Sequence, residues 1–289
     1  SWEVKSQLSG TMNIGGGDEP KYSTIKEAVD SLNKEGISGS VEFRIYAGNY
    51  YGGFVINSVA GANHNDTIVF TSATEDYNDV LIRKDSTDSV NYLVKLNGSK
   101  YVTFKKLTFK TLPYPLVKHI VLNNGASYNR FENCVFNAKE GQDCNSGNYN
   151  HGIVIHDKPS DKKQEFNHFT NNKIKGGCIG ISLEGKAGEL EEGNLITGNE
   201  FTKQNYKAVE VVHNSHGHFN HNTVRYKGDS TAVTLKVDSV YEVQGNSIFS
   251  KGNKALLVDS FEASQPMVTN FAGLSVLNLS LIHISEPTR

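Results

Sequence analysis

A repeated pattern of apolar positions runs through the chain and is clearest between residues 207 and 253. Each copy has a small residue and two alternating apolar residues, followed after a short connection by an apolar-x-x-Asn-x-apolar string. Val209 and Val233 are 24 residues apart, and Phe219 and Val243 are also 24 residues apart. A repeat of this length, found in both halves of the unit, predicts a solenoid in which each coil covers the apolar residues of its neighbour.

The same unit can be followed along the chain as two rows of apolar residues. The first row pairs Val94 with Leu96, Ile120 with Leu122, Ile153 with Ile155, Ile181 with Leu183, Val209 with Val211, Val233 with Leu235, and Leu256 with Val258. The second row starts at Phe104, Phe131, Phe169, Ile196, Phe219, Val243 and Met267. Three positions after these starts lie Leu107, Cys134, Asn172, Asn199, Asn222, Asn246 and Asn270. Asparagines at one position of successive coils predict an inward ladder, because their side chains can hydrogen-bond to one another along the stack.

A single amphipathic helix is predicted before the repeats, over about residues 23–36. Ser23 is the expected N-cap, and the apolar residues then fall at helical spacing on one face: Ile25, Ala28, Val29 and Leu32. Because a stack of coils leaves its end core open to water, we expect this helix to cap the solenoid. The predicted organisation is a lead-in over residues 1–22 and one domain over 23–278.

The asparagine column, the cap helix and the steps of 23 to 28 residues together resemble the right-handed parallel β-helix of the pectate-lyase-like superfamily. The resemblance covers roughly residues 20–275. A β-propeller, the main alternative, needs four antiparallel strands per about 40–45 residues and family marks that this sequence lacks. We therefore expect an all-β fold, a right-handed parallel β-helix (solenoid) with an N-terminal capping α-helix.

Composition narrows the possible partners. The 289 residues carry a formal net charge of −2 with both signs interspersed, which disfavours nucleic acid as a partner. No run of about 18 apolar residues is present, so no membrane span is expected. The three cysteines fit no metal spacing. Cys134 and Cys178 are expected to be small inward residues, and Cys144 lies in a loop.

The two ends of the chain have features of their own. The sequence begins at Ser1 without an apolar leader, which suggests a processed chain or a fragment. Residues 279–289 resemble a translated sequencing-adapter tail. We expect this tail to be non-native and exclude it from the interpretation of the fold.

Candidate chemistry lies on the outward side of the first row. Three long insertions flank this row, at residues 137–150, 156–168 and 184–195. In lyases and hydrolases with the resembled fold, the sugar groove runs over the strand row that such loops flank. Because side chains alternate between faces along a strand, the outward residues share one surface patch. The candidates are His156, Glu184 and Glu210 for catalysis, and Lys236, Lys95, Asn123 and Ser182 for substrate binding.

Two interpretations of this patch remain open. Its two glutamates can act as general acid and base on a glycosidic bond or ligate Ca²⁺ for lyase chemistry, with His156 as a proton donor and Lys236 binding an acidic sugar. Alternatively, it is the ordinary charged face of a solenoid. The acidic residues at 189, 191 and 192 are expected to be solvent-exposed. Four clustered histidines suggest either a metal site or turn caps: His213, His216, His218 and His221.

The resemblance implies a secreted or cell-surface bacterial protein that binds an extended polysaccharide and, as an enzyme, cleaves it as a lyase or glycoside hydrolase. No cofactor is required by the sequence, and Ca²⁺ is the one candidate. A non-catalytic adhesin or stalk is the competing hypothesis, and a phage-type receptor-binding spike is a third.

Overall fold

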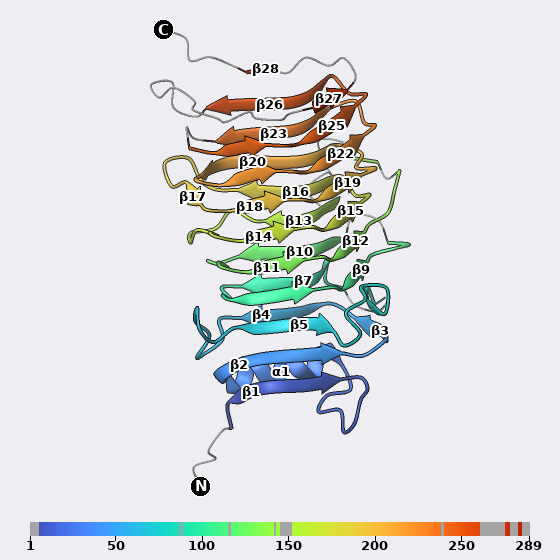
Figure 1. Cartoon of the computed structure of the whole chain (residues 1–289), viewed down its shortest axis with the longest axis vertical. Coiled ribbons are helices and arrows are strands. Elements are labelled where there is room, and N and C mark those ends of the chain that lie inside the picture. The colour runs from blue at the N-terminus through green and yellow to red at the C-terminus, as the bar shows by residue number, and fades with distance from the viewer. Residues whose placement is uncertain are drawn as a thin grey trace.

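The computed structural model describes residues 6–260, except 86, 88, 115–116, 142, 145–151 and 238–239, together with residues 275–277 and 283–284. Three parallel sheets stack coil on coil into a column, with β1 at one end and β26 towards the other (Figure 1). The predicted all-β parallel β-helix is therefore confirmed. In the described residues, no helix is long and apolar enough to cross a membrane.

From β2 to β26, each coil contributes one strand to each sheet in turn. Sheet A contains β1 (Leu8–Ile14), β2 (Ile37–Ile45), β5 (Ile68–Ser72), β8 (Val102–Lys105), β11 (Arg130–Glu132), β14 (His168–Thr170), β18 (Leu195–Thr197), β21 (His218–Asn220) and β24 (Glu242–Gln244). Sheet B contains β3 (Gly48–Tyr51), β6 (Val80–Arg83), β9 (Thr108–Lys110), β12 (Val135–Asn137), β15 (Lys173–Lys175), β19 (Glu200–Thr202), β22 (Thr223–Tyr226), β25 (Ser247–Ser250) and β27 (Ser275–Leu277). Sheet C contains β4 (Phe54–Asn57), β7 (Tyr92–Asn97), β10 (Lys118–Asn123), β13 (Ile153–Asp157), β16 (Ile179–Glu184), β20 (Lys207–Ser215), β23 (Thr231–Val237), β26 (Lys254–Ser260) and β28 (His283–Ile284). The short strand β17 (Glu191–Glu192) pairs with the end of β20.

The interior of the column is apolar because parallel pairing in register places like residues one above another. Phenylalanine rings of sheet A stack from coil to coil, with centroids 5.1 Å apart between Phe70 and Phe104 and 5.5 Å apart between Phe104 and Phe131. Phe169 continues this stack. The second predicted row is thus the inward row of sheet A, and its expected member Met267 lies outside the described residues.

The asparagine ladder forms at the turn between sheets A and B. The side-chain amide nitrogens of Asn172, Asn199 and Asn222 each donate to the carboxamide oxygen of the next asparagine at 3.0–3.1 Å. Asn246 ends the described part of the ladder, since Asn270 lies outside the described residues. Cys134 begins it, with its backbone N–H donating to Asn172 Oδ1. The predicted ladder is confirmed at these positions.

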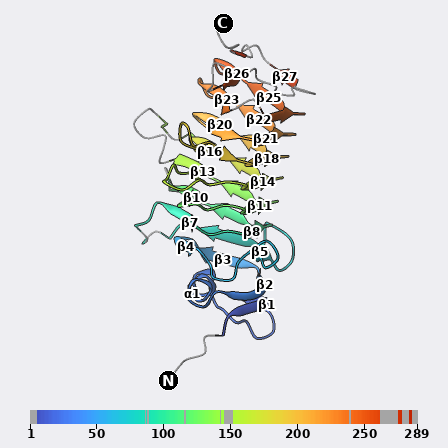
Figure 2. The same cartoon turned by 90° about the vertical axis from the view of Figure 1, so that its left-hand side faces the viewer.

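The helix α1 (Ile25–Glu35) is present, but its N-cap is Thr24 and the prediction of Ser23 was wrong. Thr24 and Glu27 form a reciprocal capping box, which Ser23 cannot form because it lies four residues before Glu27. The four predicted apolar residues are buried. Figure 2 shows α1 beside β1 and β2 at the N-terminal end of the column.

The register of β13 differs from the prediction by two residues. Ile155, and not Ile153, aligns with Ile120 and Ile181. Ile153 instead packs with Ile179 in a small apolar cluster separate from the main core. Val154, expected to face outward, is fully buried in the main core. The apolar pattern alone could not distinguish these registers, because Ile153 and Ile155 have the same parity and both are buried.

Candidate functional site

The outward side of sheet C brings the predicted site residues onto one face in two parallel rows. Lys95, Val121, His156, Ser182 and Glu210 are paired successively across β7, β10, β13, β16 and β20. Two positions further along the strands, Asn123 lies on β10, and Glu184 and Lys236 both align with Val212. The seven candidates thus extend over six strands, or about 24 Å at ~4.8 Å per strand.

Within the described part of this face, His156 is the centre of a group of contacts that joins several candidates. Its side chain is nearly buried, with 6% of the residue exposed. Lys118 Nζ lies 2.6 Å from His156 Nδ1, and Glu184 Oε1 lies 3.5 Å from His156 Nε2. Ser182 Oγ donates to the same glutamate oxygen at 2.8 Å. Lys118, His156, Ser182 and Glu184 therefore form one continuous polar cluster.

Burial determines the charge states in this cluster. The pKa of His156 is lowered mainly by burial, against the opposing hydrogen bond to Glu184. Burial also lowers the pKa of Lys118 to about 8, helped by the positive charge of Lys158. Burial would raise the pKa of Glu184, but hydrogen bonds from His156 and Ser182 outweigh it and lower the pKa. Near neutral pH the imidazole is uncharged, the glutamate is ionised, and Lys118 can lose its proton.

This charge pattern fixes the tautomer of His156. A charged Lys118 can only donate, so Nδ1 accepts and the ring proton sits on Nε2, towards Glu184. The cluster therefore links a lysine, an imidazole and a carboxylate in one line. Such a line can move a proton between its two ends.

Among the described residues, no hydrogen bond or ion pair joins Glu210, Lys95, Lys236 or Asn123 to this cluster. Glu210 forms an ion pair with Lys207 on its own strand, and both side chains are largely buried. Lys95 lies two strands before β13, and Lys236 lies two strands after β16. Both therefore lie away from the central cluster.

Sequence reasoning missed Lys118, Lys158 and Lys207. Lys118 and Lys207 lie two positions before the inward Ile120 and Val209 and so share the parity of the inward row. Their side-chain nitrogens nevertheless contact the outward His156 and Glu210. Because strand alternation assigns both positions to the inward row, periodicity could not have found either lysine. Lys158 directly follows β13, and its charge affects the pKa values of both Lys118 and His156.

A second, fully buried polar cluster lies beneath the site. Asp157 takes the inward position that Leu122 and Leu183 occupy on neighbouring coils, and it is 1% exposed. Glu191 is 2% exposed, so the expectation that it is solvent-exposed was wrong. Gln164 donates from Nε2 to Asp157 Oδ1 at 2.8 Å and from its backbone N–H to Glu191 Oε1 at 3.0 Å. These contacts anchor the insertions at 156–168 and 184–195 to each other.

The pKa values of both buried carboxyl groups are raised, mainly by burial. The pKa of Asp157 is raised well above its usual range by burial and by the neighbouring Glu191. Burial also raises the pKa of Glu191. Because two negative charges in one buried site repel each other strongly, the pair retains a proton.

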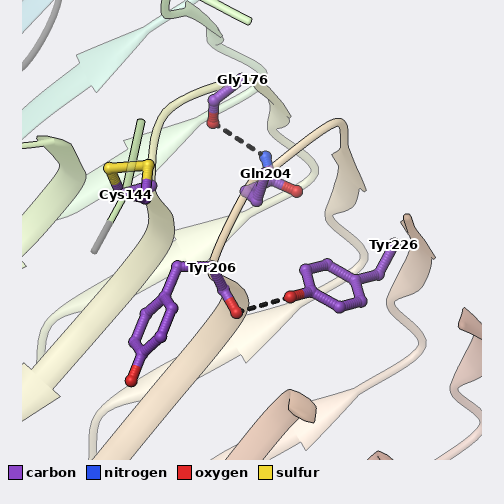
Figure 3. The surroundings of a disulfide bond; sticks show 6 residues. Cys144, Gly176, Gln204, Tyr206 and Tyr226 are labelled. Carbon is purple, nitrogen blue, oxygen red and sulfur yellow. Dashed lines mark hydrogen bonds between the residues drawn. A yellow bond between two sulfur atoms is a disulfide. The ribbon is translucent and has the colours of Figure 1, made fainter. Parts of the chain in front are cut away.

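The expectation for Cys178 as an inward apolar residue was wrong, because it forms a disulfide with Cys144. The bond, shown in Figure 3, ties Cys144 of the insertion at 137–150 to the residue before β16. Ile153 and Ile179 pack against it. Nearby, Tyr226 Oη donates to the carbonyl oxygen of Tyr206 at 2.6 Å, and Gln204 Nε2 donates to that of Gly176 at 3.3 Å. Cys134 is a buried free thiol, as expected.

The four clustered histidines face different partners. His213 Nδ1 lies 3.1 Å from the carbonyl oxygen of Gly185, and His218 Nδ1 lies 3.6 Å from Glu242 Oε2. His216 and His221 have positive φ angles of 49° and 56° at turns. Among the described residues, no group of three or more His, Cys, Asp or Glu side chains is arranged to hold a metal ion.

Comparisons with known proteins identify the fold. No protein-family model matches the chain, and no curated protein matches it in sequence. Among solved structures, a pectin methylesterase from Aspergillus niger superimposes with a TM-score of 0.58 at 13% identity, over 99% of this chain and 93% of that one. Pectate lyase Pel9A gives a TM-score of 0.55 at 11% identity, over 96% and 79% of the two chains. An alginate lyase from Paenibacillus sp. gives 0.51 at 12% identity, over 92% and 98%. The predicted pectate-lyase-like parallel β-helix is confirmed, and the named neighbours act on polysaccharides.

Proposed function

We propose that this chain binds an acidic polysaccharide across the outer face of sheet C and cleaves it by β-elimination at Lys118 and His156. The observation that carries the proposal is the Lys118–His156 contact, in which a lysine with a pKa of about 8 lies beside a neutral imidazole. A lysine that loses its proton near neutral pH is a suitable general base. The similarity of the fold to pectin- and alginate-active enzymes supports the substrate class.

Charge on this face supports an anionic ligand. Between β7 and β23, five lysines on or beside this face accompany two glutamates, and Glu210 is already paired with Lys207. The lysines are Lys95, Lys118, Lys158, Lys207 and Lys236. Their spread along sheet C matches a chain of uronate sugars, each of which carries one carboxylate.

The proposed reaction moves one proton from carbon to oxygen. Neutral Lys118 removes the proton from C5 of a uronate, the C5–H electrons form a C4–C5 double bond, and the C4–O4 bond breaks. His156 donates its Nε2 proton to the departing O4, while the newly charged Lys118 returns a proton to Nδ1. Glu184 positions the imidazole and favours the proton on Nε2. Lys158 stabilises the charge that develops on the substrate carboxylate.

Elimination fits this geometry better than hydrolysis by the two glutamates. A hydrolase needs one protonated carboxyl group with a raised pKa, whereas that of Glu184 is lowered. Glu210 is held by Lys207 and is therefore a poor partner for it. The alternative of a non-catalytic adhesin or stalk would be favoured if the chain binds acidic polysaccharides but produces neither unsaturated products nor new reducing ends.

The test is incubation with pectate and alginate while ultraviolet absorbance of unsaturated ends is recorded. Lys118→Met should lower kcat by about 10²–10⁴-fold, the range typical of a lost general base. Lys254→Met is the matched control, because Lys254 starts β26 as Lys118 starts β10, and it should retain activity. A wild-type chain inert on both polymers, or an active Lys118→Met variant, would exclude the proposed reaction.

The disulfide supports a location outside the reducing cytoplasm. Structural disulfides persist in oxidising compartments, and Cys144–Cys178 anchors a long insertion beside the site. The proposed place of action is therefore secreted or at the cell surface, where polysaccharides are accessible. Reduction under native conditions should lower activity if this anchor holds the insertion in place.

A further inference from the structure

A separate hollow of about 590 Å³ lies on the outer face of sheet A. Its floor is a row of outward residues that are paired in register across five strands: Glu42, Val69, Thr103, Arg130 and His168. The small residues Val69 and Thr103 lie between longer side chains, which leaves the row concave. Four strand spacings of ~4.8 Å make this floor about 19 Å long.

One wall of the hollow is a ladder of three aromatic rings. Tyr101 and Tyr128 stack with centroids 5.1 Å apart, and Tyr128 and Phe166 stack with centroids 4.9 Å apart. Each ring precedes its floor residue by two positions, so the ladder runs parallel to the row. Tyr128 is 39% exposed. Within the described residues, neither tyrosine hydroxyl has a hydrogen-bond partner in the structure.

The backbone at these three aromatic residues is unusual. Their φ angles are 62° at Tyr101, 61° at Tyr128 and 55° at Phe166, a left-handed conformation that bulky side chains rarely adopt. The same turn of the next coil uses Gly193, for which a φ of 67° is inexpensive. Stacking on the outside of the molecule offsets part of the strain. The strained positions nevertheless keep ring edges and hydroxyl groups in a hollow, which is typical of a ligand-binding surface.

The four charged residues that line the hollow balance one another, because Glu42 and Glu132 are acidic and Lys105 and Arg130 are basic. Glu42 pairs with Arg44, and Arg130 lies 3.7 Å from Glu132. Burial, aided by Arg130 and His218, lowers the pKa of His168 to about 4, so this imidazole is neutral at pH 7. A neutral imidazole both donates and accepts hydrogen bonds. The hollow therefore favours an uncharged polar ligand, in contrast to the lysine-rich face of sheet C.

We infer that this hollow of sheet A is a second binding site, which takes a linear neutral oligosaccharide lying parallel to the column axis. Sugar rings present C–H patches to the apolar ring edges and hydroxyl groups to Tyr101, Tyr128, His168 and Arg130. The floor spans several coils, so consecutive sugar rings meet a similar set of groups at each coil. The site goes beyond the proposed function, because it lies on another sheet and recognises a different class of sugar.

The experiment measures binding of neutral cello-, manno- and xylo-oligosaccharides by calorimetry at low and high salt. At least one should bind, with an affinity that changes less than twofold with salt, because no net charge is neutralised. Thr103→Trp fills the floor and Tyr128→Ala removes the most exposed ring, and each should weaken binding at least tenfold. Tyr128→Phe keeps the stack and should give a smaller loss. Tyr51→Ala is the matched control, since Tyr51 is 58% exposed and lies outside the hollow.

The outcomes separate this site from the one on sheet C. Thr103→Trp should leave cleavage of acidic polymers unchanged, and Lys118→Met should leave binding of neutral sugars unchanged. No binding of any neutral oligosaccharide, or unchanged binding by both Thr103→Trp and Tyr128→Ala with unchanged melting temperatures, would overturn the inference. Dimerisation that Thr103→Trp abolishes, without sugar binding, would also overturn it by identifying a second copy as the occupant.

Discussion

Two sets of buried polar side chains in this molecule find hydrogen-bond partners away from water in different ways. The asparagine ladder from Asn172 to Asn246 repeats once per coil, and each carboxamide both donates to and accepts from its neighbours. The cluster of Asp157, Gln164 and Glu191 occurs once, between two insertions. In this cluster, Asp157 Oδ2 and Glu191 Oε2 are buried without a conventional donor. The asparagine ladder thus pairs its buried polar groups without any charged side chain. The cluster of Asp157, Gln164 and Glu191 instead depends on a proton that one of its carboxyl groups retains.

This difference between the ladder and the cluster predicts which part of the molecule responds to pH. The ladder contains no group that titrates between pH 4 and 9, so its contribution should not change with pH. The carboxyl pair lies directly beneath His156 and joins the insertions that border the site. Changes of pH should therefore act first on the candidate site and its loops, and leave the column unaffected.

The largest expected effect comes from breaking the ladder in its middle. Asn222→Leu removes the acceptor of two hydrogen bonds from Asn199 and the donors to Asn246 and to the carbonyl oxygen of Ile196. Since each buried group left unpaired costs about 1–3 kcal/mol, we expect a loss of about 3 kcal/mol or more in the free energy of unfolding. Chemical denaturation at pH 5 and pH 8 should give the same loss. The exposed Asn253→Leu serves as control, and an equal effect of both variants would show that the column is not a ladder in solution.

The next effect, of opposite sign, comes from removing the retained proton. Asp157→Asn replaces the protonated carboxyl by an amide that can still accept from Gln164 and donate to Glu191. Because the folded pKa of Asp157 is raised above its unfolded value, its contribution is fully present below about pH 4 and is lost as pH rises through the folded pKa. We therefore expect Asp157→Asn to be stabilising by about 1–2 kcal/mol at pH 8, and by less at pH 4.

The measurement is the free energy of unfolding as a function of pH for wild type and Asp157→Asn. The stability of wild type relative to Asp157→Asn should fall as pH rises above 4, because the contribution of the protonated Asp157 is lost. Glu192→Gln is the control, because Glu192 is the exposed neighbour of Glu191 on β17. Parallel curves for wild type and Asp157→Asn would mean that the carboxyl pair does not retain a proton.

The same contrast explains what the sequence could and could not reveal. Features that recur once per coil were predictable, because repetition separates signal from chance: the parallel β-helix, the phenylalanine stack, and the column at Asn199 and Asn222. Outward alternation also placed His156, Glu184 and Glu210 on one face. However, the sequence did not indicate that Glu210 is engaged by Lys207.

Features that occur once, or in an insertion, were not predictable from periodicity. The extra isoleucine in β13 made two registers equally apolar, and the choice depended on the cluster that Ile153 and Ile179 form beneath the Cys144–Cys178 disulfide. The burial of Glu191 depended on a tertiary contact with Gln164, which no local pattern records. The second asparagine series, in which Asn129 Nδ2 donates to Asn167 Oδ1 at 3.1 Å, was missed because only the other turn was aligned.

The smallest expected effect would sharpen the comparison by extending the ladder one coil towards the N-terminus. Cys134 occupies the ladder position of its coil, and its thiol lies 3.5 Å from the carbonyl oxygen of Phe104. In the equivalent places, Asn172 and Asn199 donate to the carbonyl oxygens of Phe131 and Phe169. Cys134→Asn can therefore make the same bond and offer its oxygen to the backbone N–H of Leu107.

One additional satisfied rung should raise the free energy of unfolding by about 0.5–1 kcal/mol, the usual net value of a buried hydrogen bond, less any cost of the larger side chain. Thermal unfolding of Cys134→Asn beside Cys134→Ser would check this, since serine is too short to bridge the coils. If asparagine destabilises the chain as much as serine does, the ladder depends on the apolar start that Cys134 and Leu107 provide. Its length would then be limited by packing at that end and not by the number of coils.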